Sequence, residues 1–344
     1  MKDEELMLSV IMAVHETPKE YLNQAIDSIL NQSYTEYEFI IIDDGCINME
    51  TIECLEEYNI LDNRIKLIRN SENIGLTRSL NRALKECRGK YIARMDSDDI
   101  SLPERFKTQI EYMENNPEIC LCGSNTVVFD GDKIIFDESQ IHSRIRRKEI
   151  ADIRMLVENT GFAHSTFMIR KAFLDEHAIW YDEGLRYAQD YGLVTDIIIN
   201  GGKIHRIEKV LLKYREYAGQ LSVACHSAQN ECQLRSSQKR LMNSFEGLSE
   251  RECGIIAELP YDISHYTCNE IVSALKRMFI INRKSRLFNR RLLEQEMRYY
   301  WYKKIKHVCK RKKKVGDIDV FFALMSIPAI VNIKWEEFRL GSTL

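Results

Sequence analysis

The fold of this 344-residue chain is decided by the stretch Tyr91-Ile92-Ala93-Arg94-Met95-Asp96-Ser97-Asp98-Asp99. Residues 91–95 form a short apolar run that indicates a buried strand, and three carboxylates follow where that strand leaves the sheet. Carboxylates this close repel one another unless a cation neutralises them, and hard oxygen ligands suit Mg²⁺ or Mn²⁺ holding a diphosphate. The alternative is an acidic turn before a helix that begins at Leu102-Pro103-Glu104.

The segments before this stretch alternate between strand and helix patterns. Apolar runs predict strands over 8–14, 39–42 and 65–68, and the 39–42 run is stopped by Asp43-Asp44-Gly45. Helices are predicted after Thr17-Pro18, with Thr17 as N-cap and Pro18 in the first turn, and over 51–58 and 76–87. This alternation predicts an α/β fold, a mostly parallel sheet with helices on both faces, in which ligands gather at the carboxyl ends of the strands.

The pattern becomes mixed after the hairpin-like turn Asp130-Gly131-Asp132. We expect a helix over 145–157, a strand over 166–169, a helix from about Asp190 to Asn200, and strands over 203–207 and 210–217. Beyond Ser222 the chain reads as helical. The sequence therefore predicts two domains, residues 1–223 and a mainly α-helical, basic region over 224–344.

Composition indicates a globular protein, with 44% hydrophobic and 29% charged residues. The charged start of the chain has no signal-peptide pattern, and the ten cysteines are scattered without a CxxC pair. These features predict reduced thiols and a cytoplasmic location.

Charge is distributed unevenly along the chain. Residues 276–314 hold sixteen Lys and Arg against Glu294 and Glu296, a net charge of +14, which leaves −17 for the rest of a chain whose total is −3. A basic segment on an acidic body indicates an anionic partner, either membrane lipid or nucleic acid.

Taken together, the motifs resemble those of the family-2 glycosyltransferases, whose nucleotide-sugar-binding fold is called GT-A, over about residues 8–222. The run Ser9-Val10-Ile11-Met12-Ala13-Val14-His15-Glu16 resembles the family's opening strand and uracil-binding turn, which assigns Ala13, His15 and Glu16 to the nucleotide. The family usually has Tyr-Asn where this chain has His15-Glu16. Ile41-Ile42-Asp43-Asp44-Gly45 resembles the element that binds base and ribose, which implies Asp43 and Asp44.

Further motifs follow in the family's order. The loop Asn73-Ile74-Gly75 resembles the element below the phosphates, which implies Asn73 and Gly75. The resemblance sets Arg78 facing the diphosphate, against the alternative of an exposed helix arginine. Met95-Asp96-Ser97-Asp98-Asp99 resembles the Asp-x-Asp motif. The resemblance makes Asp98 the direct metal ligand, sets Asp96 at the ribose or the waters of the metal, and sets Met95 beside the nucleotide.

Two later motifs complete the resemblance. His164, in Phe162-Ala163-His164-Ser165-Thr166, corresponds to a histidine near the donor sugar, against the alternative of a structural histidine. Ala188-Gln189-Asp190 resembles the family's Glu-Asp or Gln-Asp motif, which makes Asp190 the catalytic base and sets Gln189 at the sugars. The alternative for Asp190 is a simple N-cap. Many relatives have a histidine where this chain has Tyr217.

The resemblance implies a metal-dependent inverting glycosyltransferase that moves a sugar from a nucleotide diphosphate sugar to a saccharide hydroxyl. Asp43 and Asp44 with His15 opposite favour a UDP-sugar donor, with Mn²⁺ or Mg²⁺ as cofactor. A sugar-phosphate nucleotidyltransferase is the competing enzyme class, but His15-Glu16-Thr17-Pro18 lacks the glycine-rich basic loop that grips a triphosphate. A non-catalytic protein acting through its basic tail on membrane or nucleic acid is the other alternative.

The basic C-terminal segment and the apolar run after it indicate which partners the chain binds. Residues 318–330 are apolar but interrupted by Asp319 and Pro328, too short to cross a bilayer, which takes about 20 residues. We expect this segment to lie in a membrane interface beside the basic run, with a lipid-linked saccharide as acceptor, a peripheral location on the plasma membrane and no nucleic-acid partner. The alternative is a helical appendage packed on the catalytic domain.

Overall fold

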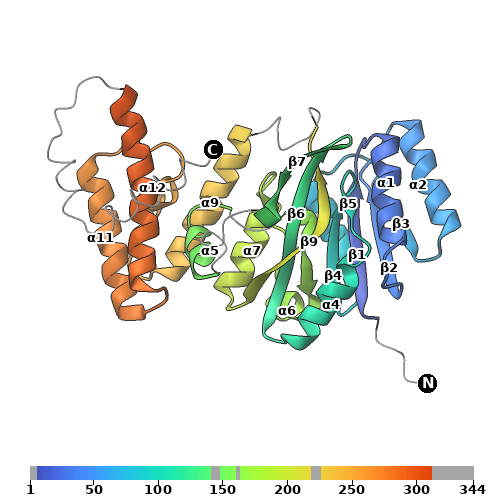
Figure 1. Cartoon of the computed structure of the whole chain (residues 1–344), viewed down its shortest axis with the longest axis horizontal. Helices are drawn as coiled ribbons and strands as arrows, with labels where there is room; N and C mark the ends of the chain where they lie inside the picture. The colour runs from blue at the N-terminus through green and yellow to red at the C-terminus, as the bar shows by residue number, and fades with distance from the viewer. Residues whose placement is uncertain (1–5, 141–147, 160–162, 218–225, 312–344) are drawn as a thin grey trace. The chain divides into compact units, whose positions relative to one another are not determined.

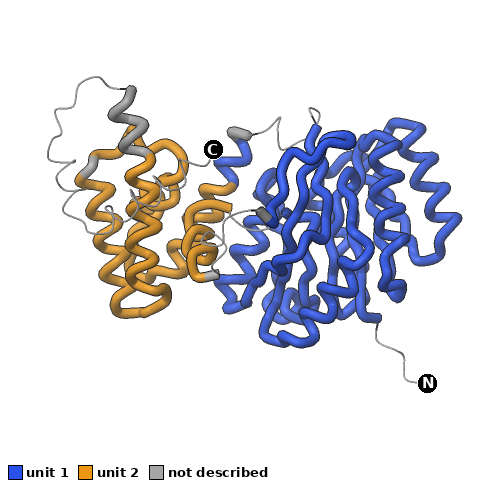
Figure 2. Tube along the Cα trace, viewed as in Figure 1, with its two compact units in different colours: residues 1–141, 161–232 blue, residues 142–160, 233–344 orange. Residues whose placement is uncertain are grey.

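The computed structural model describes residues 6–140, 148–159, 163–217 and 226–311. The chain divides into two compact units, drawn in blue and orange in Figure 2. Unit 1 comprises residues 1–141 and 161–232, and unit 2 comprises 142–160 and 233–344. The sequence predicted a division near residue 223, and the segment 142–160, expected in the first domain, belongs to unit 2.

The first half of the sheet in unit 1 is parallel. Its strands are β1 (Leu8–Val14), β2 (Tyr37–Asp43), β3 (Ile65–Arg69) and β4 (Tyr91–Asp96), in the spatial order β3-β2-β1-β4 (Figure 1). Each of these strands pairs in parallel with its neighbour. Their carboxyl ends therefore meet at one edge of the sheet.

The second half of the sheet is mixed. It contains β5 (Ile100–Ser101), β6 (Ile119–Asp130), β7 (Lys133–Asp137), β8 (Met168–Arg170) and β9 (Lys203–Arg215). The short strand β8 runs antiparallel to both β4 and β6, whereas β6 and β9 are parallel. The two strands predicted over 203–217 are one strand, since β6 continues its pairing from Ile207 to Val210 across a bulge.

Helices cover both faces of this sheet, as the α/β prediction requires. They are α1 (Lys19–Leu30), α2 (Met49–Leu61), α3 (Leu76–Glu86), α4 (Arg105–Asn115), α6 (Lys171–Glu176) and α7 (Gln189–Ile199). Alternate residues of β1, such as Val10 and Met12, share a core cluster with α1 and α4. Ile11 is buried on the opposite face, where α3 contacts β1 and β2. The predicted fold class is confirmed.

The start of α1 differs from the prediction. Pro18 is the N-cap, and no side chain caps this end of the helix. The hydroxyl of Thr17, expected to cap, instead hydrogen-bonds the hydroxyl of Ser97 at 2.6 Å. Thr17 therefore forms a hydrogen bond with a residue distant in the sequence and leaves the first amides of α1 without a side-chain cap.

Unit 2 is helical in the part of the chain that the structure describes. It contains α5 (Lys148–Arg154), most of α9 (His226–Ser244), α10 (Glu250–Ala257), α11 (Cys268–Ser285) and α12 (Arg290–Arg311), as Figures 1 and 2 show. Full capping boxes at Ser249/Glu252 and Thr267/Glu270 start α10 and α11. No helix among the described residues is long and apolar enough to span a bilayer. The segment 318–330 lies outside the described residues.

A buried ion pair joins α5 to α12. Arg154 Nε lies 2.8 Å from Glu296 Oε2, and the two side chains are 17% and 4% exposed. Burial keeps water from solvating either charge, so each depends on the other. This pair fixes the segment 148–154 to unit 2.

We predict that Glu296→Leu lowers the free energy of unfolding of unit 2 by about 3–5 kcal/mol, because it leaves the Arg154 charge buried without its carboxylate. The double variant Arg154→Met/Glu296→Leu recovers most of the loss, since it buries no charge. Chemical denaturation of both variants measures the difference. Equal destabilisation by the single and the double variant contradicts the prediction.

Candidate active site at the carboxyl ends of the parallel strands

Strand register brings the predicted site residues to one edge of unit 1. Ala13 on β1 pairs with Asp96 on β4 and with Ile42 on β2, and Val14 pairs with Asp43. The acidic ends of β2 and β4 therefore flank the turn that follows β1. The hydrogen bond between Thr17 and Ser97 ties that turn to the acidic stretch after β4.

Asp44 organises the loop that leads into α3. One carboxylate oxygen accepts hydrogen bonds from Asn70 Nδ2 at 2.8 Å and from the amide of Ile74 at 3.0 Å, and the other accepts from the amide of Gly75 at 3.0 Å. Asp44 is 2% exposed. The Asp44 carboxylate thus makes hydrogen bonds within the protein, and its contact with base or ribose stays a prediction.

Asp43 is also engaged within the protein. It is 4% exposed, accepts from the amide of Cys46 at 2.9 Å and pairs with Arg69 at 3.4 Å. Like Asp44, it shapes the edge on which a nucleotide is predicted to lie.

His15 and Glu16 form the turn after β1. The exposed ring of His15 is anchored through Nδ1, 3.1 Å from the carbonyl oxygen of Asp44. Glu16 has the left-handed φ of 53° and accepts hydrogen bonds from the amides of Ile47 at 2.6 Å and Asn48 at 3.3 Å. The turn is therefore fastened to the loop after β2.

The loop before α3 has the geometry of an Asx turn. Asn73 Oδ1 accepts from the amide of Gly75 at 2.9 Å, and Gly75 has φ +90°, which a side chain rarely allows. Arg78, predicted to face the diphosphate, forms an ion pair with Glu183 at 3.2 Å, and both side chains are more than half exposed. This ion pair gives no independent support for the predicted contact of Arg78 with the diphosphate, which stays a prediction.

The acidic stretch after β4 is built around a buried arginine. Arg94 is 2% exposed and ion-pairs with Asp96 at short range, and it donates to Ser165 Oγ at 3.1 Å. The hydroxyl of Ser165 in turn contacts the carboxylates of both Asp96 and Asp99. Met95 is fully buried and belongs to the core, so its side chain does not face the site edge.

A second arginine completes the cluster from β9. The amide of Arg215 donates to Asp99 Oδ1 at 2.9 Å, and its Nε donates to the carbonyl oxygen of Asp98 at 2.6 Å. The hydroxyl of Tyr217 hydrogen-bonds the carboxylate of Asp98. Tyr217, where relatives often have a histidine, thus still reaches the predicted metal ligand.

Sequence reasoning missed Arg94, Ser165 and Arg215. Arg94 carried one usable signal, because a charge inside an apolar strand must find a partner when that strand is buried. Ser165 and Arg215 are 69 and 116 residues from the carboxylates they bind, and no local pattern marks them.

His164 and Tyr181 form a partly buried polar pair near Asp96. His164 Nε2 lies 2.8 Å from the Tyr181 hydroxyl. Burial and the charge of Arg94 hold the pKa of His164 well below its usual value, so the ring is neutral. Burial, and then the nearby charges of Asp190 and Asp96, raise the pKa of Tyr181. His164, Asp190 and the acidic stretch therefore share one neighbourhood.

Asp190 is the second residue of α7, not its N-cap. The N-cap is Ala188, in the left-handed conformation with φ 53°. A carboxylate in the first turn is stabilised by the helix dipole, and Asp190 remains partly exposed. Gln189 is 9% exposed, and its side chain is largely covered by protein.

Known proteins resemble this chain over most of unit 1. The model of glycosyl transferase family 2 matches residues 9–178. An uncharacterised glycosyltransferase of Methanocaldococcus jannaschii, MJ1057, is 38% identical over 209 residues, which cover 61% of this chain and 70% of the relative. The O-antigen biosynthesis glycosyltransferase WbnJ of Escherichia coli is 37% identical over 213 residues, 61% of this chain and 79% of the relative. The chain belongs to glycosyl transferase family 2.

Solved structures agree on the fold of this glycosyltransferase. TarS 1–349 of S. aureus, in complex with UDP-GlcNAc, has a TM-score of 0.58 at 17% identity and covers 87% of this chain and 88% of its own. The mannosyltransferase PcManGT of Pyrobaculum calidifontis, in complex with GDP-Man and Mn²⁺, has a TM-score of 0.56 at 12% identity, covering 89% and 88%. The expected GT-A fold is confirmed.

The chemistry of the acidic cluster fits a divalent cation. Asp96 pairs with the guanidinium group of Arg94, whereas the Arg215 side chain bonds the carbonyl oxygen of Asp98 and the side chain of Gln24. Burial, followed by the charge of Asp96, raises the pKa of Asp98 to about 6. Burial and the charges of Asp96 and Asp98 raise the pKa of Asp99 well above its usual value. The raised pKa values show that the negative charge of this cluster is not fully compensated within the enzyme. Carboxylate oxygens at such a place are suitable ligands for a divalent cation.

The raised pKa of Asp98 predicts how stability depends on pH without metal. At pH values between 3.8, the ordinary pKa of an aspartate, and about 6, the folded chain binds the proton of Asp98 more tightly than the unfolded chain does. The resulting stabilisation is present at low pH and is lost as the pH rises through about 6. Relative to Asp98→Asn, the wild type should therefore lose about 2 kcal/mol between pH 4 and pH 7.

Denaturant unfolding in EDTA at several pH values measures this difference. Asp132→Asn, an exposed change in the β6–β7 turn, is the control and should track the wild type. Parallel pH profiles for the wild type and Asp98→Asn contradict the electrostatic account of the cluster.

Proposed function

We propose that this glycosyltransferase transfers a sugar from a UDP-sugar to a hydroxyl group of a saccharide acceptor, with inversion, in the synthesis of a cell-surface polysaccharide. The observation that carries the proposal is the cluster of Asp96, Asp98 and Asp99, whose negative charge exceeds what Arg94, the ion-pair partner of Asp96, neutralises. The O-antigen role of WbnJ supports the acceptor class.

Asp98 and Asp96 would hold Mn²⁺ or Mg²⁺ at the end of β4. When bound, such an ion neutralises the charge that develops on the leaving diphosphate. Arg94 and Ser165 hold the carboxylate of Asp96 in place from within the protein. Tyr217 orients Asp98 by donating to its carboxylate. The complex of PcManGT with GDP-Man and Mn²⁺ supports a metal in this fold.

Asp190 is the proposed general base. An acceptor hydroxyl has a pKa far above neutral, so a carboxylate must remove its proton as it attacks the anomeric carbon. Asp190 stands on the first turn of α7, partly exposed and close enough to influence Tyr181. One base and one attacking hydroxyl give a single displacement, which inverts the configuration.

Replacement of the base should remove turnover and spare donor binding. Asp190→Asn keeps size and polarity but cannot accept a proton, so kcat should fall by about 10²–10⁴-fold with the dissociation constant for the donor near unchanged. Asp132→Asn, an exposed change in the β6–β7 turn, is the control and should keep wild-type turnover. Wild-type turnover in Asp190→Asn moves the base to another residue.

Nucleotide choice is proposed from the turn after β1. The exposed ring of His15 presents an aromatic surface on which a base can stack, and the TarS complex with UDP-GlcNAc supports uridine. Calorimetry with Mn²⁺ should give tighter binding of UDP than of GDP or CMP, and Asp98→Asn should weaken the UDP complex. Tighter binding of GDP, the nucleotide of the PcManGT complex, contradicts the donor assignment.

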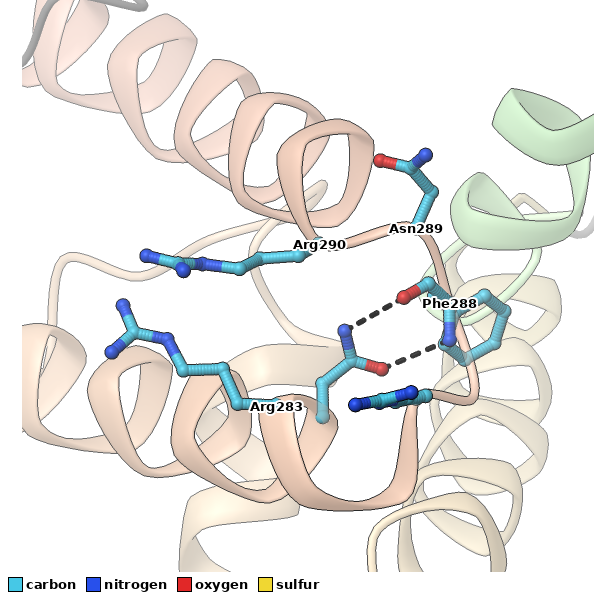
Figure 3. A pocket seen from close by; sticks show the side chains of 6 residues that line it. Arg283, Phe288, Asn289 and Arg290 are labelled. Atoms are coloured by element: carbon cyan, nitrogen blue, oxygen red, sulfur yellow. Dashed lines mark hydrogen bonds between the residues drawn. The ribbon is translucent and has the colours of Figure 1, made fainter.

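Unit 2 supports association with an anionic membrane. A cavity of about 460 Å³ at the turn between α11 and α12 is lined by Asn282, Arg283, Arg286, Phe288, Asn289 and Arg290 (Figure 3). The carboxylate of Glu294 is shared among Arg283, Arg290 and Arg298. Cations therefore outnumber the carboxylate here, and Ile280 and Leu287 nearby are about half exposed. A lipid phosphate matches this surface, and a lipid-linked acceptor would lie on the same membrane.

Removal of the three cavity arginines should release the enzyme from lipid. Each Lys or Arg near an anionic bilayer contributes about 1 kcal/mol, so Arg283→Ala/Arg286→Ala/Arg290→Ala should weaken binding to phosphatidylglycerol vesicles by about 10²-fold. Co-sedimentation at low salt measures this change. A control, Lys107→Ala/Lys133→Ala/Lys209→Ala, removes the same charge from exposed positions of unit 1 and should keep binding. A wild type that stays in the supernatant contradicts the membrane role.

A further inference from the structure

Three side chains of different ligand chemistry meet beside the turn after β1. A ring nitrogen of His15, a carboxylate oxygen of Glu16 and Sγ of Cys46 all lie within 4.8 Å of one another. His15 and Glu16 follow β1 directly, and Cys46 lies in the loop after the neighbouring strand β2. The parallel pairing of β1 and β2 therefore sets their separation.

We propose that His15, Glu16 and Cys46 form a binding site for a borderline-soft divalent cation of the zinc class, distinct from the oxygen-ligand site at Asp98. Imidazole, carboxylate and thiolate ligands suit Zn²⁺ and Co²⁺, whereas Mg²⁺ and Mn²⁺ prefer oxygen alone. Three protein ligands leave a fourth, solvent-facing position beside the exposed ring of His15.

The histidine is held in the way that metal sites require. Its Nδ1 lies 3.1 Å from the carbonyl oxygen of Asp44, so Nδ1 carries the proton and Nε2 keeps its lone pair. A backbone carbonyl behind a ligating histidine fixes both the tautomer and the ring orientation.

Glu16 and Cys46 are fixed as well. Glu16 Oε1 accepts hydrogen bonds from the amides of Ile47 and Asn48, which aim its carboxylate at the loop that contains Cys46. The amide of Cys46 is tied to Asp43 Oδ1 at 2.9 Å. Glu16 adopts φ 53°, a conformation that costs a residue with a side chain of order 1 kcal/mol. This strained conformation of Glu16 places its carboxylate beside His15 and Cys46.

Binding requires the loss of one proton. Burial raises the pKa of the Cys46 thiol to about 12, and the thiol donates to the carbonyl oxygen of Val14 at 3.5 Å. On binding, the S–H bond breaks, its proton passes to solvent and the thiolate binds the cation. The net charge of the three ligands changes from −1 to −2, which suits a divalent ion.

Occupancy would regulate the enzyme, a consequence that rests on the proposed function. The ring of His15 is the proposed stacking surface for the base, and a cation on Nε2 with its fourth ligand would occupy space beside that surface. Zinc at this site would therefore weaken donor binding, although the Asp98 site is untouched.

Cobalt absorption of the full-length, EDTA-treated protein tests the site without any nucleotide. Co²⁺ should produce thiolate-to-metal charge-transfer absorption in the wild type, and Zn²⁺ should displace it. Cys46→Ser should abolish this absorption. His15→Ala, which changes an exposed side chain and so spares the fold, should weaken Co²⁺ binding by at least ~10²-fold, because loss of an outer-shell partner alone costs ~10–100-fold.

Cys54→Ser is the matched control. Its hydroxyl can replace the thiol that donates to Asn23 at 3.0 Å, and the Co²⁺ spectrum should be unchanged. Absence of the charge-transfer absorption in the wild type, or its persistence in Cys46→Ser, overturns the site. A separate titration of UDP with and without Zn²⁺ tests regulation, and equal affinities overturn that consequence alone. A failure of UDP to bind at all would count against the proposed function, whereas the cobalt spectrum would still decide the site.

Discussion

The burial of Arg94 inside β4 is the constraint on which the candidate active site depends. A guanidinium group that is 2% exposed must be paired, and here it pairs with Asp96, which follows it on the same strand. Ser165 then links Asp96 to Asp99, and Arg215 closes the cluster from β9. The charge of Arg94 is paired with Asp96, and the pKa values of Asp98 and Asp99 remain raised.

The same arrangement explains how distant segments of unit 1 act together. The antiparallel strand β8 brings Ser165 and His164 to β4, and the parallel pairing of β1 with β4 brings the turn of His15 and Glu16. Tyr181 connects this cluster electrostatically to Asp190 on α7. The proposed metal ligands, sugar-side histidine and base therefore lie in one neighbourhood, although they are far apart in the sequence.

Local patterns predicted the elements that local forces determine. Apolar runs ending in acids located β2, β4 and the edge where Asp96 and Asp98 lie. Prediction failed where a residue distant in the sequence determines the local structure. Thr17 hydrogen-bonds Ser97 instead of capping α1, and pairing with β6 joins two predicted strands into the single strand β9. Asp190 is not an N-cap, because Ala188, in the left-handed conformation, is the N-cap of α7. Ser165 and Arg215 could not be assigned, since their roles exist only in the folded cluster.

The central claim is that the uncompensated charge of this cluster recruits a divalent cation through Asp98. Anomalous diffraction from crystals of the full-length protein grown with UDP and Mn²⁺ tests this claim most directly. The account predicts a manganese peak about 2.1 Å from an oxygen of the Asp98 carboxylate and in contact with the diphosphate. Bound UDP with no manganese at Asp98, or manganese bound away from the end of β4, would contradict it.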